Sequence, residues 1–562
     1  MSLTVAALAF AAAAGLSATV GGLTAGSITT GVAVPSLALG VVAALLAARA
    51  TAAVAPHGQG HLMKGEGLVL AAAWLTLLLA GLRQFLWLGV SDGTSVSQLN
   101  PYDYGDLPLH WSYVRFFAEG ASFWPQNPIF TGTRLGYPIG SDLLAALFVK
   151  LGADPAVVFR STGIVATVAL GVALRRWGGG LAMAAFVLSG GFALSRFAPG
   201  ALLRADDSDL AWKNLLLALF VPQRGFLFAL PAGLLFLWSA REKLLRDRSG
   251  LPSWVEGLLW GALPLFHVHT FLVVSVVYGL WAVGGRRQLQ AALPTVLVAV
   301  PLATFGLWQV TDGFAAARVV WWKPGWMIGG DNPLVFLLLN FGLLPPLAIA
   351  MLIRPPRDDA RAARLTLAPA LGLFALFFFL MLAPWEWDNT KAFIWCVLLM
   401  LGPLSAWLAE RPRAVGAILG ALVLLPGLPA ALGGFLASKP LDIFEEAELS
   451  AVCAALKGVP ADARIATVQT FNHPVGLCGR ALVAGYGGHL WSHGLRAEPV
   501  QERLARLMKG EPDWQADARA LGARYVFWGP REARAFPFST RPWAEAGRLR
   551  AATPYGELFA LD

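Results

Sequence analysis

The sequence predicts an α-helical polytopic membrane protein with a small C-terminal α/β domain. Hydrophobic residues make up 57% of the chain and charged residues only 14%, whereas an ordinary soluble domain carries about 25% charged residues. Apolar stretches of about 18 or more residues recur along residues 1–438, and each can cross a bilayer core of roughly 30 Å. Residues 439–562 instead have the polarity of a soluble domain. We therefore expect a membrane domain followed by a small soluble one.

About 13 apolar stretches qualify as membrane helices by length and composition. The first lies at the N-terminus, which lacks the basic residues of a signal peptide, so we expect a membrane helix there. The alternative, which the small residues of this stretch allow, is a cleaved signal peptide. The stretches lie at about residues 3–23, 31–48, 67–88, 155–174, 180–197, 223–240, 254–268, 270–285, 288–310, 332–353, 365–384, 390–409 and 414–436. Residues 254–285 could form one tilted helix, but two short helices that break near residues 267–270 keep Arg286 and Arg287 with the other basic residues.

The basic residues predict the orientation of these helices. Lys and Arg concentrate in short loops on the cytoplasmic side of membrane proteins. With the N-terminus inside, the basic loops all fall in the cytoplasm, at residues 49–64, 175–176, 241–248, 286–287, 354–364 and 411–413. The formal net charge of +9 then reflects membrane topology, so we expect no nucleic-acid partner. The protein is expected in the cell (inner) membrane.

The opposite, extracytoplasmic side receives two large pieces. The first outer loop, about residues 89–153, contains predicted helices near 107–119 and 139–151, whose apolar faces suit the membrane surface. The C-terminal domain is predicted to be a small α/β unit. Its predicted strands are 464–469 and 523–528, and its predicted helices are 443–457 and 499–509. If this domain lies outside the cytoplasm, Cys453 and Cys478 are able to form a disulfide.

Five polar clusters fall on this same side, which indicates an active site at a membrane surface. Chance placement would scatter acids, histidines and tryptophans over both faces. The clusters are residues 103–110, 204–209, 267–269, 321–326 and 385–391. In the second cluster, Asp206, Asp207 and Asp209 could hold a divalent cation with help from elsewhere, although such runs are more often solvated.

The first cluster carries the candidate general base. Asp103 and Asp106 lead into a predicted amphipathic helix, where a carboxylate can take a proton from an acceptor hydroxyl. Asp106 is the favoured base, and His110 shares its helical face four residues on. The alternative is that Asp106 caps the helix, with Pro108 in the first turn, and the two roles are compatible.

Basic side chains at the ends of spans are candidate phosphate ligands. Arg224, preceded by Gln223, stands at the entry of a span, where a lipid phosphate is a fitting partner. The alternative is that Arg224 reaches the membrane interface by itself. Lys391 forms either a local ion pair with Asp388 or a contact with a phosphate, and Asp388 is itself a candidate substrate contact. Lys323, in the tryptophan-rich cluster, is a further phosphate candidate.

Histidines and tryptophans are candidate substrate contacts. Trp322 can stack on a sugar ring, although aromatic residues at this depth are often only an interface belt. His267 and His269 do not share a helical face, so they are no ready metal pair. Either can hydrogen-bond a sugar or a phosphate, or can simply cap a helix. The sequence contains no phosphate-cradling loop and no dinucleotide fingerprint.

The arrangement resembles the GT-C superfamily of polytopic membrane glycosyltransferases, in the branch that includes protein O-mannosyltransferases and the aminoarabinose transferase of lipid A. The resemblance lies in the acidic motif of the first outer loop, the phrase GYPIGSDLLAALFVKLG, the many spans and the outer C-terminal domain. Two features depart from the family pattern. Tyr104 and Gly105 separate the two acids, which are often adjacent, and two additional helices precede the acidic loop. The phrase CGRALVAGYGGHLWSHG looks like the soluble domains of such transferases, but the resemblance gives its residues no role.

The resemblance implies a polyprenyl-phosphate sugar donor, an inverting transfer and an acidic base, which is Asp106 or Asp103 here. It also implies that Arg224 or Lys391 lies near the donor phosphate. The expected partners are this donor, membrane lipids and a glycan, lipid or protein acceptor on the outer side. No cofactor is identified, and a divalent cation is left open.

Three other functions are compatible with the sequence. A transporter for a lipid or an envelope polysaccharide would need polar residues in the middle of its spans, whereas this chain keeps its charges at the ends. A membrane scaffold would not depend on Asp106. A polysaccharide polymerase or ligase would transfer from an oligosaccharide-pyrophosphate donor.

Overall fold

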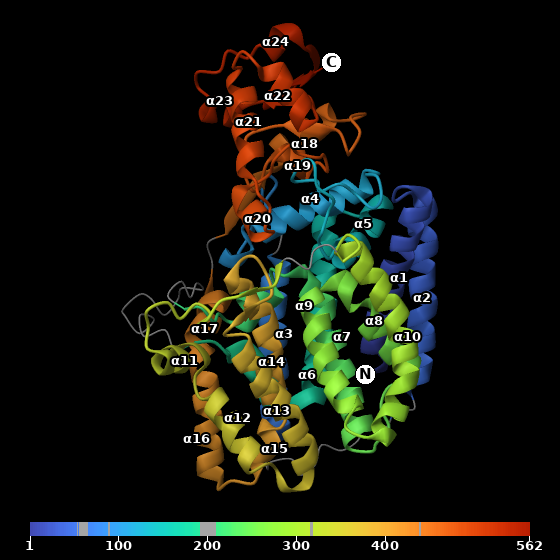
Figure 1. Ribbon diagram of the computed structural model, residues 1–562, viewed down its shortest axis with the longest axis vertical. Coiled ribbons are helices and arrows are strands. Elements are labelled where there is room, and N and C mark those ends of the chain that lie inside the picture. The colour runs from blue at the N-terminus through green and yellow to red at the C-terminus, as the bar shows by residue number, and fades with distance from the viewer. Residues whose placement is uncertain are drawn as a thin grey trace.

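The computed structural model describes residues 1–52, 54, 66–87, 90–191, 210–314, 319–437 and 440–561. Long helices form a bundle in the lower part of the molecule, and the C-terminal region stands on one end of it (Figure 1). The bundle helices are α1 (Ser2–Ala25), α2 (Thr30–Ala52), α3 (Glu66–Leu86), α6 (Pro155–Leu188), α7 (Arg224–Ala240), α8 (Ser253–Phe266), α9 (Val268–Ala282), α10 (Arg286–Val310), α11 (Pro333–Phe341), α12 (Leu344–Ile353), α13 (Ala360–Leu376), α14 (Thr390–Leu401), α15 (Leu404–Ala409), α16 (Arg413–Leu424) and α17 (Leu428–Leu436).

The helical bundle has the length and composition of a membrane domain, as predicted. Within the described residues, 7 helical segments are long and apolar enough to cross a membrane, and the bent pair of α11 and α12 would be an eighth. The two helices of this pair meet at 95°. The protein is therefore an integral membrane protein, with several shorter apolar helices packed among the long ones.

Two of the predicted breaks between spans appear in the structure. Helix α8 ends at Phe266 and α9 begins at Val268, with His267 in an extended conformation between them. The predicted pair of spans at 155–174 and 180–197 corresponds to α6, whose backbone is not helical at Gly178 and Gly179. Gly179 has φ +75°, a conformation that glycine adopts at little cost, so the chain is able to turn there.

Basic residues from distant parts of the bundle gather at one end. The charges of Arg175 and Arg176 act electrostatically on the amino group of Met1, so these residues lie near the N-terminus. Arg246 forms an ion pair with Asp359, and it also binds Glu242. The predicted basic loops at 175–176, 241–248 and 354–364 therefore share one end of the bundle, opposite the C-terminal region. Most of the predicted loop at 49–64 lies outside the described residues.

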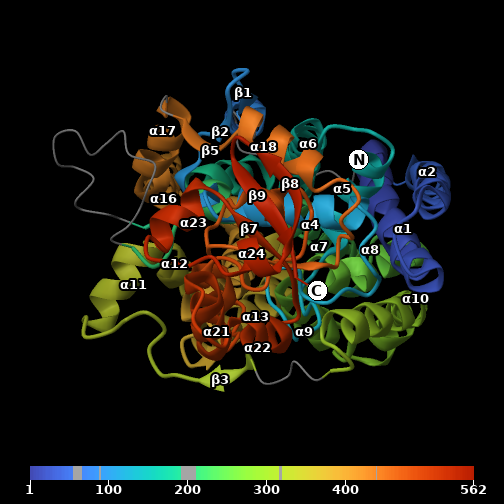
Figure 2. The same cartoon turned by 90° about the horizontal axis from the view of Figure 1, so that it is seen from above.

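The C-terminal region contains a four-stranded sheet in the order β6–β7–β9–β8. Strand β6 (Arg464–Ala466) runs parallel to β7 (Ala523–Trp528), and β9 (Gly556–Ala560) is antiparallel to both β7 and β8 (Arg548–Thr553). The sheet lies over the middle of the bundle when viewed from above (Figure 2). The helices of this region are α18 (Glu446–Ala455), α19 (Pro474–Leu477), α20 (Gly487–Ser492), α21 (Glu498–Lys509), α22 (Trp514–Leu521), α23 (Pro530–Ala535) and α24 (Trp543–Ala546). The predicted α/β unit is confirmed.

The C-terminal region is joined to the first outer loop by strands and by close packing. Strand β2 (Ser95–Gln98) pairs with β1 (Val90–Ser91) and with β5 (Leu441–Glu445). A disulfide links Cys453 to Cys478, as the sequence suggested. Just beyond it, a Cβ added at Gly479 would lie 2.6 Å from the backbone of Arg115. The disulfide therefore ends at a surface that packs tightly on the outer loop.

The two predicted helices of the outer loop are present as α4 (Asp106–Ala118) and α5 (Gly140–Lys150). The expectation that their apolar faces lie on the membrane is wrong. Both helices are buried over most of their length, because α5 packs on α1, α4 and the neighbouring bundle helices while α19 packs on α4. Their apolar residues are covered by protein, and this holds the start of α4 in a fixed place.

Candidate active site

The two predicted acids lie at the start of α4 and have different surroundings. Asp103 ends a short 3₁₀ turn, is only 3% exposed, and its carboxylate accepts a hydrogen bond from the Leu107 N–H. That N–H is one of the unpaired donors of the helix N-terminus. Asp106 is the first residue of α4, and its side chain is half-buried. The capping role considered for Asp106 therefore falls to Asp103, and Asp106 keeps a partly open carboxylate.

A buried polar chain supports His110, one turn into α4. Its Nδ1 atom lies 2.9 Å from both carboxylate oxygens of Asp142 in α5. Behind Asp142, the Nε atom of Arg224 lies 3.7 Å from the same carboxylate. The guanidinium covers the ring of Phe159 at 3.7 Å and donates to the Thr162 hydroxyl at 3.3 Å. Asp142 thus fixes the orientation of the His110 ring. Arg224, at the end of this chain, is buried, with only 4% of its surface exposed.

Lys391 and Asp388 bring a second pair of charges to the acids. Lys391 lies in the first turn of α14, and its Nζ atom is 3.0 Å from Asp388. The buried amide of Asn389 bonds to residues 377–382 and so fixes the start of this helix. Lys391 and Asp388 both act electrostatically on Asp106, as does His110. Two segments far apart in the sequence, the start of α4 and the start of α14, therefore meet around Asp106.

Burial dominates the acidity of both carboxyl groups. It raises the pKa of Asp103 well above its ordinary value, and the neighbouring Asp106 adds to the rise. Burial also raises the pKa of Asp106, while the charges of His110 and Lys391 oppose the rise and that of Asp388 adds to it. A carboxylate with a raised pKa is a stronger base than an ordinary aspartate.

The two predicted histidines of the α8–α9 break lie against neighbouring elements. The Nδ1 atom of His267 accepts the N–H of Thr270 at 3.1 Å, so His267 caps α9. The ring of His267 packs on Phe226 at 4.0 Å, and that of His269 is 5.6 Å from it. His269 bonds through Nε2 to the backbone oxygen of Leu382 at 3.1 Å. The charge of Lys391 acts electrostatically on both rings, so the two histidines lie near the start of α14.

The tryptophan-rich cluster lies next to the residues that precede α14. Its strand β3 (Trp321–Trp322) pairs with β4 (Leu380–Met381), and Lys323 forms an ion pair with Glu386. Trp322 is 62% exposed and stacks on Phe379. Within the described part of the chain, no hydrogen bond or ion pair joins Lys323 to Asp103 or Asp106. The cluster is therefore joined to the segment that leads into α14.

Other predicted residues have less defined places. Gln223 immediately precedes α7 and is half-buried. The acidic run at residues 204–209 lies outside the described residues. Among the residues that are described, no group of three or more His, Cys, Asp or Glu side chains is arranged to hold a metal ion.

The structure adds residues from the C-terminal region that sequence reasoning did not assign. The ring of His489 in α20 hydrogen-bonds to the backbone of Gly105, between the two acids. The ring of His493 lies 5.1 Å from that of Tyr137, which in turn is 6.1 Å from the ring of His110. Burial lowers the pKa of His489 to about 4 and that of His493 to about 3. Both imidazoles are therefore neutral at pH 7.

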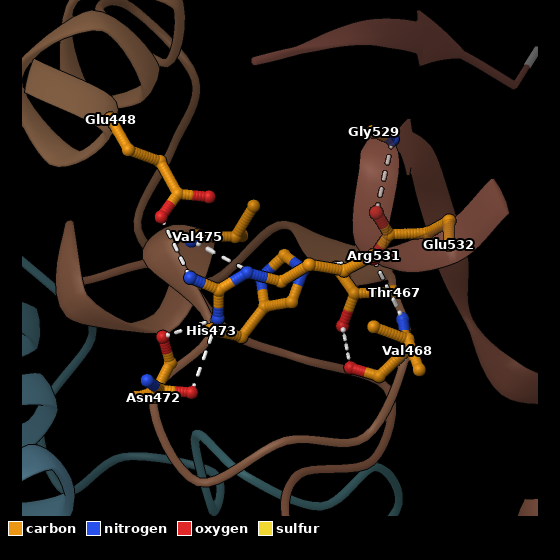
Figure 3. Close-up of polar contacts among 9 residues, drawn as sticks. All are labelled: Glu448, Thr467, Val468, Asn472, His473, Val475, Gly529, Arg531 and Glu532. Carbon is orange, nitrogen blue, oxygen red and sulfur yellow. Dashed lines mark hydrogen bonds and ion pairs between the residues drawn. The ribbon is translucent and has the colours of Figure 1, made fainter. Parts of the chain in front are cut away.

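A second buried charged cluster lies within the C-terminal region (Figure 3). Glu532 accepts hydrogen bonds from His473 at 2.8 Å and from the backbone of Val468 and Gly529 at 3.0 Å each. Arg531 bonds to Glu448 at 2.7 Å. Because these groups satisfy one another, the cluster stabilises the packing of α18, α19 and α23 around the sheet.

Comparisons with known proteins show a likeness of fold. No protein-family model matches the chain, and no curated protein matches it. Among solved structures, ArnT from Cupriavidus metallidurans in the apo state matches at 12% identity and a TM-score of 0.44, over 88% of this chain and 98% of that one. The oligosaccharyltransferase of Archaeoglobus fulgidus in the apo form matches at 13% identity and a TM-score of 0.39, over 83% and 69%. The same enzyme in complex with Zn and sulfate gives 12% and 0.37, over 82% and 68%. The likeness concerns the fold alone.

Proposed function

We propose that this protein is a membrane glycosyltransferase that moves a sugar from a polyprenyl-phosphate donor to an acceptor hydroxyl on the extracytoplasmic side. One observation carries the proposal. Asp106 keeps a half-buried carboxylate at the start of α4, and His110, Asp388 and Lys391 act on it from one end of the bundle. Acids and bases at a helix end near hydrocarbon are costly unless they are used.

The proposed reaction needs one base and one cation. The Asp106 carboxylate takes the proton of the acceptor hydroxyl while that oxygen bonds to the anomeric carbon of the sugar. The bond between this carbon and the phosphate oxygen breaks, and the phosphate leaves with the electron pair. Lys391 stabilises the negative charge that grows on the phosphate. Attack opposite the leaving group inverts the anomeric centre, so no covalent intermediate is required.

The other site residues have supporting roles in this proposal. Asp103 caps α4 and keeps Asp106 at the helix start. Arg224 holds Asp142, which orients the His110 ring toward the substrate. His267 and His269 hold the break between α8 and α9 beside Lys391. Arg224 would reach the phosphate only if its contact with Asp142 opened, so Lys391 is the stronger phosphate candidate.

In this proposal, donor and acceptor enter beside the tryptophan-rich cluster. Trp322 presents an exposed ring on which a sugar can stack, and Lys323 stands beside it as a second cation for the lipid phosphate, with Gln223 as a further polar contact. The acceptor is a glycan, a lipid or a protein that carries an accessible hydroxyl. Membrane lipids surround the bundle.

Two features support an extracytoplasmic site. The basic loops gather at the opposite end of the bundle, and such loops face the cytoplasm. The Cys453–Cys478 disulfide belongs to the same end as Asp106, and disulfides persist in oxidising compartments rather than in the cytosol.

The proposal is tested by sugar transfer with purified protein and a panel of polyprenyl-phosphate sugars. We expect Asp106→Asn to lower kcat by a factor of about 100 or more, because general-base catalysis contributes that much. The matched control is Asp513→Asn, since Asp513 is an exposed aspartate of the C-terminal region. Thermal unfolding checks that each variant is folded, and NMR of the product reads the anomeric configuration.

The remaining outcomes of this experiment separate the alternatives. A folded Asp103→Asn variant that loses transfer while Asp106→Asn keeps it would move the base to Asp103. A preference for oligosaccharide-pyrophosphate lipids, included in the panel, would identify a polymerase or ligase. Wild-type protein that transfers no sugar from any donor would contradict the proposal and favour a transporter or a scaffold.

A further inference from the structure

The two residues that separate the acids are both contacted by the C-terminal region. His489 hydrogen-bonds to the backbone of Gly105, and a Cβ added at this glycine would lie 3.1 Å from the His489 Nε2 atom. Gly105 has φ −97° and ψ −40°, values that any residue adopts readily. Its backbone conformation therefore does not require glycine, whereas the approach of the His489 ring favours a residue without a side chain.

Tyr104, the other separating residue, is held by aromatic side chains of the same region. Its hydroxyl hydrogen-bonds to that of Tyr486. The ring of Phe471 packs edge-on against Tyr104 at 5.7 Å and against Tyr486 at 6.0 Å. Tyr486 in turn packs on His489 at 5.2 Å. The C-terminal region thus contacts both of the residues that lie between Asp103 and Asp106.

The segment that carries Tyr486 and His489 is itself anchored to the rest of the molecule. The N–H of Gly485 donates to the oxygen of Ile129 in the outer loop at 2.8 Å. At the other end of α20, a Cβ added at Gly494 would lie 2.6 Å from Pro384, just before α14. Because the segment is fixed at both ends, it can hold the turn between the acids in one position.

We infer that His489 and Tyr486 are positioning residues, which fix Asp106 relative to the substrate by holding Tyr104 and Gly105. This role rests on the proposed function. The His489 ring is neutral and hydrogen-bonds to the backbone of Gly105, whose carbonyl accepts the N–H of Leu109 inside α4. We call the contacts of His489 and Tyr486 with Gly105 and Tyr104 the clamp. A displacement of about 1 Å in a reacting group can cost about 100-fold in rate, so the clamp on α4 matters to catalysis. The C-terminal region is then a structural part of the active site.

The test compares variants that remove or preserve the hydrogen-bond donor. His489→Leu removes it, whereas His489→Gln places an amide N–H at a similar reach. We expect His489→Leu to lower kcat by roughly 10- to 100-fold with the donor KM within about twofold, because ground-state binding is not changed. His489→Gln should recover most of the rate. Tyr486→Phe should lower kcat several-fold, and Tyr555→Phe, in the β8–β9 turn, is the matched control.

Amide hydrogen exchange of residues 103–110 supplies a readout that does not depend on activity. We expect faster exchange in His489→Leu than in wild type or His489→Gln. A kcat equal to that of wild type in His489→Leu, a change in KM alone, or a His489→Gln variant as slow as His489→Leu would each overturn the clamp. If wild type transfers no sugar but His489→Leu still loosens residues 103–110, the clamp stands and the proposed function fails.

A double-mutant cycle tests the contact from the other side. Gly105→Ala would force the His489 ring to shift by a few tenths of an ångström, because the new Cβ is too close to Nε2. If the two residues act through one contact, the effects of Gly105→Ala and His489→Ala on kcat are not additive. Additive effects would show that the two residues act separately and would overturn the clamp.

Discussion

At the scale of single residues, Asp106 has neighbouring charges of both signs, which shift its pKa and so its strength as a base. Lys391 and His110 lower its pKa, whereas Asp388 raises it beyond the rise caused by burial. The carboxylate is the active form, so transfer is lost as the pH falls through the pKa of the folded protein. Because this pKa is raised, activity should begin to fall at a higher pH than an ordinary aspartate would give.

The fall of activity at low pH, the acid limb of the pH profile, should shift in opposite directions when Lys391 or Asp388 is replaced. In Lys391→Gln the pKa of Asp106 rises further, so the acid limb of kcat/KM moves to higher pH. In Asp388→Asn the pKa falls, and the limb moves to lower pH. The measurement is a pH profile of transfer for both variants and wild type, read from the midpoint rather than the maximum rate. Movement of both midpoints in the same direction would show that Asp106 is not the titrating base.

Sequence reasoning finds the charged residues of the site but not their partners. Asp106, Arg224 and Lys391 stand out because charges beside apolar stretches are rare. Asp142 was overlooked within the phrase GYPIGSDLLAALFVKLG, because its role depends on His110, which is 32 residues away. His489 lies far from the acids in sequence, and only the fold brings the two together. Gly105, Tyr486 and His489 are visible in the sequence, but nothing in the sequence shows that they contact one another.

At the scale of elements, sequence patterns identify helices better than they identify what covers them. The break between α8 and α9 was predicted from the topology of the basic loops, and His267 provides its cap. The apolar faces of α4 and α5 were equally clear, but hydrophobicity alone does not distinguish a lipid surface from a protein surface. The 95° bend between α11 and α12 was likewise missed, because residues 332–353 read as one apolar stretch.

The disulfide is the element-scale feature with the most direct consequence for stability. It closes a loop with a sequence separation of 25 residues, and removing a native disulfide of this kind typically costs about 2–4 kcal/mol. We expect the Cys453→Ser, Cys478→Ser double variant to unfold at a lower temperature than wild type. Transfer should also fall, because Gly479, next to Cys478, packs on α4.

Thermal unfolding with and without a reducing agent measures this effect. The control is Cys396→Ala, which removes the buried free cysteine of α14 and leaves the disulfide intact. A reducing agent should lower the Tm of wild type and of this control alike, but leave the double variant unchanged. An unchanged Tm of wild type under reduction would contradict the prediction.

At the scale of the whole molecule, the basic loops and the candidate active site lie at opposite ends of the bundle. Arg246 and Asp359 close one end, and Asp106, Lys391 and the C-terminal region occupy the other. Loops rich in Lys and Arg stay on the cytoplasmic side during membrane insertion, so one charge pattern predicts the side of every loop. The overall arrangement was accessible from sequence for this reason, since it depends on composition rather than on individual contacts.

Cysteine labelling tests this orientation in spheroplasts of an expressing bacterium. Phe538→Cys places a thiol at a C-terminal position that is 94% exposed in wild type, and Arg413→Cys places one at the exposed start of α16, at the basic end. A membrane-impermeant maleimide should label the first in intact spheroplasts and the second only after the membrane is opened. The reverse pattern would put the acids in the cytoplasm. There a reducing environment would oppose the disulfide and nucleotide sugars would be available, so the case for a lipid-linked donor would fall with the orientation.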